Sequence, residues 1–192
     1  MSERNQITEH YCQNTQRFPV NKFLQRGTGR GRKLLIVGES PAQNGWRESQ
    51  RAFYTAKNQL IPSGKNLAEL LGKCDLTLEI CGFTELVKCY VGKDTSLFWR
   101  CGERCWDIFQ RQLAAYDFRV ILTLGVKTLA LINKQLNSNL SIGSISKTKI
   151  NSRRYWLLPV YHPSPANPYN HQKNLIIIET VSDDVRTILR RN

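Results

Sequence analysis

The chain has 192 residues, of which 41% are apolar and 22% charged, and its formal net charge is +13. This length and apolar content predict one compact domain and exclude a disordered tail. The excess of lysine and arginine favours a polyanionic partner, because cationic side chains release the counterions condensed on a phosphate backbone. A solvated basic surface without a partner, or one suited to acidic lipid, is the alternative.

The lengths of the apolar segments indicate whether the chain crosses a membrane. The longest runs lie at 34–37, 156–160 and 175–178. They have the length of strands and are far shorter than the roughly 20 residues that cross a bilayer, so we expect no membrane span. The first nine residues are polar and lack the apolar stretch of a secretory signal. We therefore expect a cytoplasmic protein with reduced cysteines.

Predicted strands and helices alternate along the chain. Residues 1–33 are predicted to form a basic polar leader packed on or near a single domain at 34–192. The glycines at the end of this leader precede the first strand, whereas a nucleotide-binding glycine loop follows one. We expect strands at 33–38, 83–87, 120–124, 145–150 and 155–160, and helices at 64–73 (capped by Ser63), 102–116, 127–137 and 174–190. This order predicts a three-layer α/β/α fold around a mainly parallel sheet.

The loops after the predicted strands carry unusual side chains. Glu39 follows the first strand and leads into an aromatic segment that contains Phe53, and His162 stands among prolines after the last strand. Ligands of such sheets bind beyond the carboxyl ends of the strands. Taken singly, these residues are typical of a helix cap, a core ring and a surface histidine. Together at one sheet edge, they are what an enzyme that handles nucleobases needs.

Three motifs resemble those of the uracil-DNA glycosylase superfamily. Gly38-Glu-Ser-Pro41 is similar to the first motif of its iron-sulfur branch, and His162-Pro-Ser-Pro165 to the second motif of the superfamily. Leu124-Gly-Val-Lys-Thr128 resembles the segment between them. The resemblance covers about residues 10–170 and implies a DNA repair enzyme that flips a damaged base and hydrolyses its N-glycosidic bond.

The resemblance also implies roles for single residues. Glu39 would orient the attacking water or stabilise the cationic sugar, and His162 would stabilise the leaving base. A base-binding pocket would be formed by Gly38, Ser40, Phe53 and Glu85, with Phe53 stacked on the base. Contacts to DNA would come from Lys127, Ser164 and Asn167. Ala166 stands where some relatives carry a large apolar residue that fills the gap left by the flipped base, and alanine is too small for that.

Glu85 departs from the family pattern, which has an asparagine that reads the edge of uracil. An amide both donates and accepts hydrogen bonds, whereas an ionised carboxylate only accepts them and would repel O4 of uracil. Three interpretations follow: Glu85 selects a base with two donors, it is kept protonated by burial, or the enzyme excises uracil poorly. A Glu85 that pairs with a cation away from the pocket is the fourth.

Six cysteines raise the question of a metal site. Cys89 and Cys105 resemble two ligands of the cluster in the iron-sulfur branch, but the leader offers Cys12 alone where that branch has a Cys-x-x-Cys. Cys101, one helical turn before Cys105, is a substitute. Cys12, Cys89, Cys101 and Cys105 would then hold a [4Fe-4S] cluster or zinc. The alternative is that all are ordinary buried thiols.

Two other functions fit parts of the pattern. A nucleic-acid-binding module without catalysis would not need both Glu39 and His162, and a hydrolase of nucleosides or nucleobases would not need a charge of +13. We expect DNA as the partner, no membrane, and a monomer.

Overall fold

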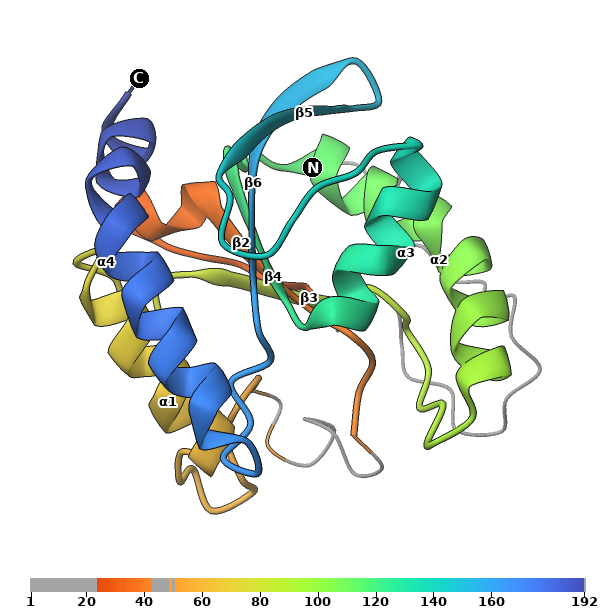
Figure 1. The fold of residues 1–192 in the computed structure, drawn as a ribbon, viewed down its shortest axis with the longest axis horizontal. Helices are drawn as coiled ribbons and strands as arrows, with labels where there is room; N and C mark the ends of the chain where they lie inside the picture. The colour runs from red at the N-terminus through yellow and green to blue at the C-terminus, as the bar shows by residue number, and fades with distance from the viewer. Residues whose placement is uncertain (1–23, 43–48, 50, 192) are drawn as a thin grey trace, which may run out of the picture.

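The computed structural model describes residues 24–42, 49 and 51–191, and a six-stranded sheet lies at its centre (Figure 1). The strand order is β1-β3-β2-β4-β6-β5. The four inner strands run parallel, and each edge strand is antiparallel to its neighbour. The strands are β1 (Leu24–Gln25), β2 (Leu34–Gly38), β3 (Gly82–Glu85), β4 (Val120–Leu124), β5 (Ser146–Ile150) and β6 (Arg153–Val160).

Helices cover both faces of the sheet. The helices α1 (Pro62–Gly72) and α4 (Pro168–Arg190) lie on one face, and α2 (Thr95–Ala115) and α3 (Val126–Leu136) lie on the other. The side chains of β2 alternate between the two cores: Leu34 and Ile36 pack toward α1 and α4, and Leu35 and Val37 toward α2 and α3. A strand buried on both faces needs such a continuous apolar run. The predicted three-layer α/β/α fold is confirmed.

Two helices begin well before their predicted starts. Helix α2 starts at Thr95 rather than 102, because the Asp94 side chain accepts a hydrogen bond from the backbone N–H of Leu97 at 2.9 Å and caps the helix. Gly102 lies inside this helix, where the side chain of Leu131 from α3 occupies the space that a Cβ would need. Helix α4 starts at Pro168 rather than 174, and Asn167 is its N-cap.

The predicted cap of α1 is wrong. Ile61 occupies the N-cap position and Pro62 the first helical position, without a side-chain capping bond. Proline suits this position because its ring fixes φ at a helical value and its missing N–H would have had no partner in the helix.

The end of the predicted leader is part of the sheet and its surroundings. Strand β1 pairs with β3, and a short 3-10 helix, η3 (Gly29–Lys33), follows and leads directly into β2. The backbone N–H of Thr28 donates to the carbonyl of Ile80 at 2.7 Å, which ties this segment to the loop before β3.

Within the described ranges, no helix is long and apolar enough to cross a membrane.

Candidate active site

Four strand ends meet at the carboxyl edge of the sheet, toward the bottom of Figure 1. Gly38 at the end of β2 lies in register with Glu85 at the end of β3. The pairing continues past the strands, since the backbone N–H groups of Leu86 and Val87 donate to the carbonyls of Gly38 and Glu39 at 2.9 and 3.0 Å. The backbone that carries Glu39 is therefore fixed by the sheet itself.

The Glu39 carboxylate faces the start of α3. Its side chain is 30% exposed, and Oε1 lies 3.5 Å from Nζ of Lys127. Lys127 was expected to contact DNA, and the structure places it beside the candidate catalytic carboxylate. An ion pair of this length between partly exposed groups contributes little to stability, and we interpret it as orienting Glu39.

His162 follows β6 and lies against the turn after β4. Its Cβ lies 3.4 Å from the position that a Cβ on Gly125 would occupy, and Gly125 has φ of +97°, which strains any residue with a side chain. The pKa of His162 lies below its usual value because desolvation disfavours the imidazolium, and the nearby Glu39 carboxylate opposes this shift. The imidazole is therefore neutral at pH 7, with one ring nitrogen that donates and one that accepts.

Two asparagines that the sequence reading missed hold the histidine loop. Asn174 is fully buried on α4, and its side chain bonds both backbone polar groups of Tyr161: Oδ1 accepts from the N–H and Nδ2 donates to the carbonyl, each at 2.9 Å. Nδ2 of Asn66 on α1 donates to the carbonyl of Pro163 at 3.1 Å. The two residues whose backbone is held in this way, Tyr161 and Pro163, lie directly before and after His162 in the sequence.

We expect Asn174→Ala to lower both stability and any activity that depends on His162. Two backbone groups of the half-buried Tyr161 lose their partner, which costs about 1–3 kcal/mol in the free energy of unfolding. Urea denaturation and excision rates measure the two effects. Asn170→Ala, in the same helix, is the matched control. Unchanged stability and activity in Asn174→Ala would show that the loop does not need this clamp.

Glu85 is buried against Gly38. The residue is 8% exposed, and its Oε2 has no hydrogen-bond partner among the described residues. A Cβ on Gly38 would overlap this carboxyl group, approaching Cδ to 2.9 Å. Burial raises the pKa of Glu85 to about 8, with Lys88 lowering it and Glu39 raising it. Glu85 is therefore mainly a neutral carboxylic acid at pH 7.

Lys88 lies fully buried behind this site and was also missed. Its Nζ donates to Oγ1 of Thr84 and Oε1 of Gln112, each at 2.8 Å, and to the carbonyl of Glu85. Burial lowers the pKa of Lys88 to about 7, while Cys105 and Glu85 oppose the shift. The Lys88 ammonium bonds the backbone of Glu85, not its carboxylate.

Phe53 has a strained backbone beside the same strand. Its φ is +67°, a value that residues with a side chain rarely adopt, and its carbonyl accepts a bond from the N–H of Ile61 at 2.9 Å. Its half-buried ring meets the ring of Phe83 edge to face, with centroids 4.8 Å apart. Phe83 and Glu85 are two residues apart on β3, so both point to the same face of the sheet. The surrounding fold thus holds an aromatic ring near Glu85 at some cost in backbone strain.

The remaining predicted site residues have local roles in the structure. Oγ of Ser164 accepts from the N–H of Ala166 at 3.3 Å, and Oδ1 of Asn167 accepts from the N–H of Asn170 at 3.3 Å. Asn167 thus caps α4 with one side-chain atom and keeps its amide N–H groups for another partner. Ser40 lies half-buried next to Glu39.

The cysteines proposed as metal ligands are only partly described. Cys12 lies outside the described residues, and Cys89, Cys101 and Cys105 are all buried. Sγ of Cys105 accepts the backbone N–H of Lys88 at 3.4 Å. Among the described residues, no group of three or more histidine, cysteine or acidic side chains is arranged to hold a metal ion. The described residues thus do not form a complete ligand set, and we derive no chemical step from a metal.

The fold is that of an open α/β sheet with helices on both faces, a class in which ligands bind beyond the carboxyl ends of the strands. The family model of the uracil DNA glycosylase superfamily matches residues 26–185. The chain belongs to this superfamily. A search of the curated proteins found no match.

Proposed function

We propose that this protein is a DNA glycosylase that flips a deaminated or otherwise modified base and hydrolyses its N-glycosidic bond. The observation that carries the proposal is the arrangement of Glu39 and a neutral His162 at one sheet edge, close enough for the charge of Glu39 to affect the titration of His162. Membership of the superfamily supports the same class of reaction.

In the proposed reaction the bond between C1′ of the sugar and the base nitrogen breaks, and its electron pair leaves with the base. The neutral imidazole of His162 donates a hydrogen bond to the base oxygen beside that nitrogen and so stabilises the anion. Glu39 stabilises the cationic sugar and orients the water that attacks C1′, and it accepts the proton that the water loses.

Glu85 would read the edge of the base as a neutral acid. A protonated carboxyl has one donor and one acceptor, as the family's amide has, so it can donate to O4 of uracil and accept from N3–H. The raised pKa supports this interpretation over the one in which Glu85 repels uracil. The ring of Phe53 would stack on the same base, an interaction worth about 1–3 kcal/mol.

DNA would be held by the surface around this edge. Lys127 lies at the start of α3 and Asn167 at the start of α4, where backbone N–H groups favour phosphates. Tyr169 is 73% exposed in the first turn of α4, close in sequence to Ala166, and offers a ring that could enter the base stack.

A [4Fe-4S] cluster or zinc ion on Cys12, Cys89, Cys101 and Cys105 remains part of the proposal. We expect a structural role, with the metal tethering the N-terminal segment. Absorbance near 400 nm would indicate the cluster. Elemental analysis would detect either metal, and Cys101→Ser should lower its content. Colourless protein without iron or zinc after anaerobic purification would contradict the metal site.

The proposal is tested with single-lesion oligonucleotides that contain uracil, hypoxanthine, xanthine or an alkylated base. Abasic sites are scored after alkaline cleavage, in single and double strands. Wild-type protein should release at least one of these bases, and Glu39→Gln/His162→Ala purified in parallel controls for contaminating glycosylases. Absence of excision from every substrate, or equal excision by the double variant, would overturn the proposal.

A further inference from the structure

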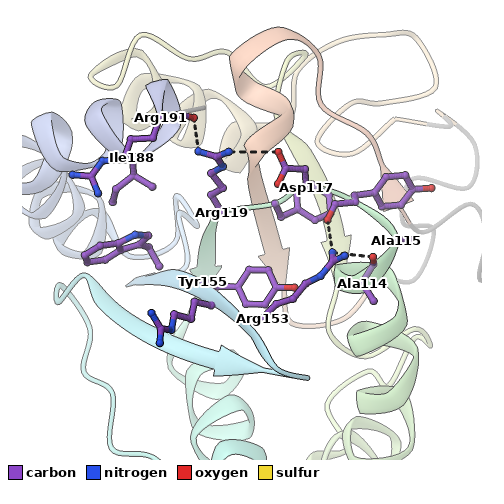
Figure 2. Close-up of a pocket in the computed structure, with 12 residues that line it drawn as sticks. Ala114, Ala115, Asp117, Arg119, Arg153, Tyr155, Ile188 and Arg191 are labelled. Atoms are coloured by element: carbon purple, nitrogen blue, oxygen red, sulfur yellow. Dashed lines mark hydrogen bonds and ion pairs between the residues drawn. The ribbon is translucent and has the colours of Figure 1, made fainter.

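A pocket of about 560 Å³ lies at the amino edge of the sheet, opposite the candidate active site (Figure 2). Its volume is in the range of small-molecule sites. The ends of α2 and α4, the segment before β4 and the start of β6 form its walls. The lining residues that matter here are four arginines, one acid and two half-buried rings: Arg119, Arg153, Arg154, Arg191, Asp117, Tyr116 and Trp156.

Two of these arginines are engaged by the protein. Arg119 donates to the carbonyl of Arg191 and lies 3.8 Å from the carboxylate of Asp117, and Arg153 donates to the carbonyl of Ala114 at 2.9 Å. Figure 2 shows both side chains directed at these partners. The carbonyl ends of α2 and α4 carry partial negative charge, so these two arginines stabilise helix termini.

The other two arginines have no such explanation. The side chains of Arg154 and Arg191 are exposed, and neither has a hydrogen bond or an ion pair with any residue that the structure describes. Asp117, the acid in the pocket wall, is already beside Arg119. The pocket therefore has an excess of positive charge that capping of the helices does not use.

The positive charge continues into an adjoining pocket of about 390 Å³. The two pockets share the wall from Ala115 to Phe118, and the second adds Arg26 and Arg32. The guanidinium of Arg26 lies 4.6 Å from the centre of the Tyr116 ring. On the other side, Nζ of Lys147 lies 4.8 Å from the centre of the Trp156 ring. Cations thus stand beside flat rings on both sides of the first pocket.

We propose that this pocket binds the phosphate of a nucleotide unit through Arg154 and Arg191, with an aromatic ring of the pocket wall beside the base. Guanidinium groups bind phosphate oxygens through paired N–H donors, and aromatic rings stack on any nucleobase. Strand β4 separates this pocket from the catalytic edge by its five residues, or about 16 Å. The site is distinct from the one that would hold the flipped base.

The unit has two sources, a free nucleotide or a nucleotide within a single strand of nucleic acid. Calorimetric titrations with thymidine, thymidine 5′-monophosphate and a short oligothymidylate distinguish them. We expect the monophosphate to bind and thymidine not to, because the arginines recognise the phosphate. Affinity that rises at least about tenfold from the monophosphate to the oligonucleotide identifies the strand as the source. Equal affinity identifies the free nucleotide.

The pocket variant is Arg154→Ala/Arg191→Ala, and its matched control is Arg100→Ala/Arg104→Ala, which removes two exposed arginines from α2. The pocket variant should bind the monophosphate at least about tenfold more weakly, whereas the control should bind as wild type does. Base excision should be unchanged in both, which also shows that they fold. Equal binding of thymidine and its monophosphate, or wild-type affinity in the pocket variant, would overturn the proposal without touching the proposed glycosylase activity.

Discussion

His162→Ala should slow base excision about 10²–10³-fold, because the leaving base loses a donor aimed at its developing charge. Glu39→Gln should slow it about 10²–10⁴-fold, since the amide neither accepts a proton nor stabilises a cationic sugar. Glu39 is half-buried, and His162 keeps exposed surface although part of its ring is desolvated, so neither change should unfold the protein. Single-turnover rates on the preferred lesion, with enzyme in excess, measure the chemical step without product release.

Two control variants test whether the losses of excision activity come from the proposed roles of His162 and Glu39. His162→Gln retains an N–H donor near the same place and should lose less activity than His162→Ala. Glu103→Gln makes the same chemical change as Glu39→Gln on α2, where Glu103 pairs with Lys134, and should excise bases at the wild-type rate. Wild-type rates for both His162→Ala and Glu39→Gln would refute the proposed mechanism.

The second large effect concerns Glu85 and pH. Because its pKa is raised to about 8, wild-type excision of uracil should fall as pH rises through that value and Glu85 ionises opposite O4. Glu85→Gln keeps one donor and one acceptor at every pH, so this fall should disappear. Lys88 and Glu39 interact with Glu85 and are present in both proteins, so the ratio of the two rates isolates Glu85. A ratio that is constant from about pH 6 to 9 would contradict the neutral-acid reading.

The raised pKa of Glu85 should also make the stability of the protein depend on pH. The folded protein holds the Glu85 proton up to about pH 8, whereas the unfolded chain loses it near 4.5, so folding is disfavoured as pH rises across this window. Relative to Glu85→Gln, wild type should lose about 1 kcal/mol per pH unit there. Lys88, with its pKa lowered to about 7, opposes the trend above that pH in both proteins. Urea denaturation at several pH values gives the difference directly.

The order of strands and helices could be predicted from the sequence because buried strands leave short apolar runs, such as 34–37 and 120–124. Helix starts were harder. The N-terminal turn of α4 lies outside its periodic apolar stretch and is specified by its cap, Asn167. In α2 the buried Phe98 and Cys101 extend the apolar spacing to before residue 102, and Asp94 caps the helix. Asn167-Pro168 is a recognisable signal for a helix start, but the prediction followed the apolar periodicity and began the helix at 174.

Some residues of the candidate site could likewise be predicted from the sequence, and others could not. Glu39 and His162 could be placed because each follows a predicted strand, and Glu85 because it lies within the predicted strand at 83–87; strand ends of a parallel sheet converge. Asn174 and Lys88 could not, because nothing local distinguishes a buried asparagine on a helix or a lysine after a strand from exposed ones. Their partners, Tyr161 and Gln112, are 13 and 24 residues away in the sequence, and only the folded chain brings them together.

The contact between Gly38 and Glu85 couples the evolution of these two positions. A Cβ at 38 overlaps the carboxyl group at 85, so a substitution at 38 requires this carboxyl group to shift or the side chain at 85 to be shorter. A shorter side chain at 85 would also alter the group proposed to read the base. A substitution at 38 would therefore disturb the proposed base-reading group even when Glu85 itself is unchanged, and libraries that vary both positions test this coupling.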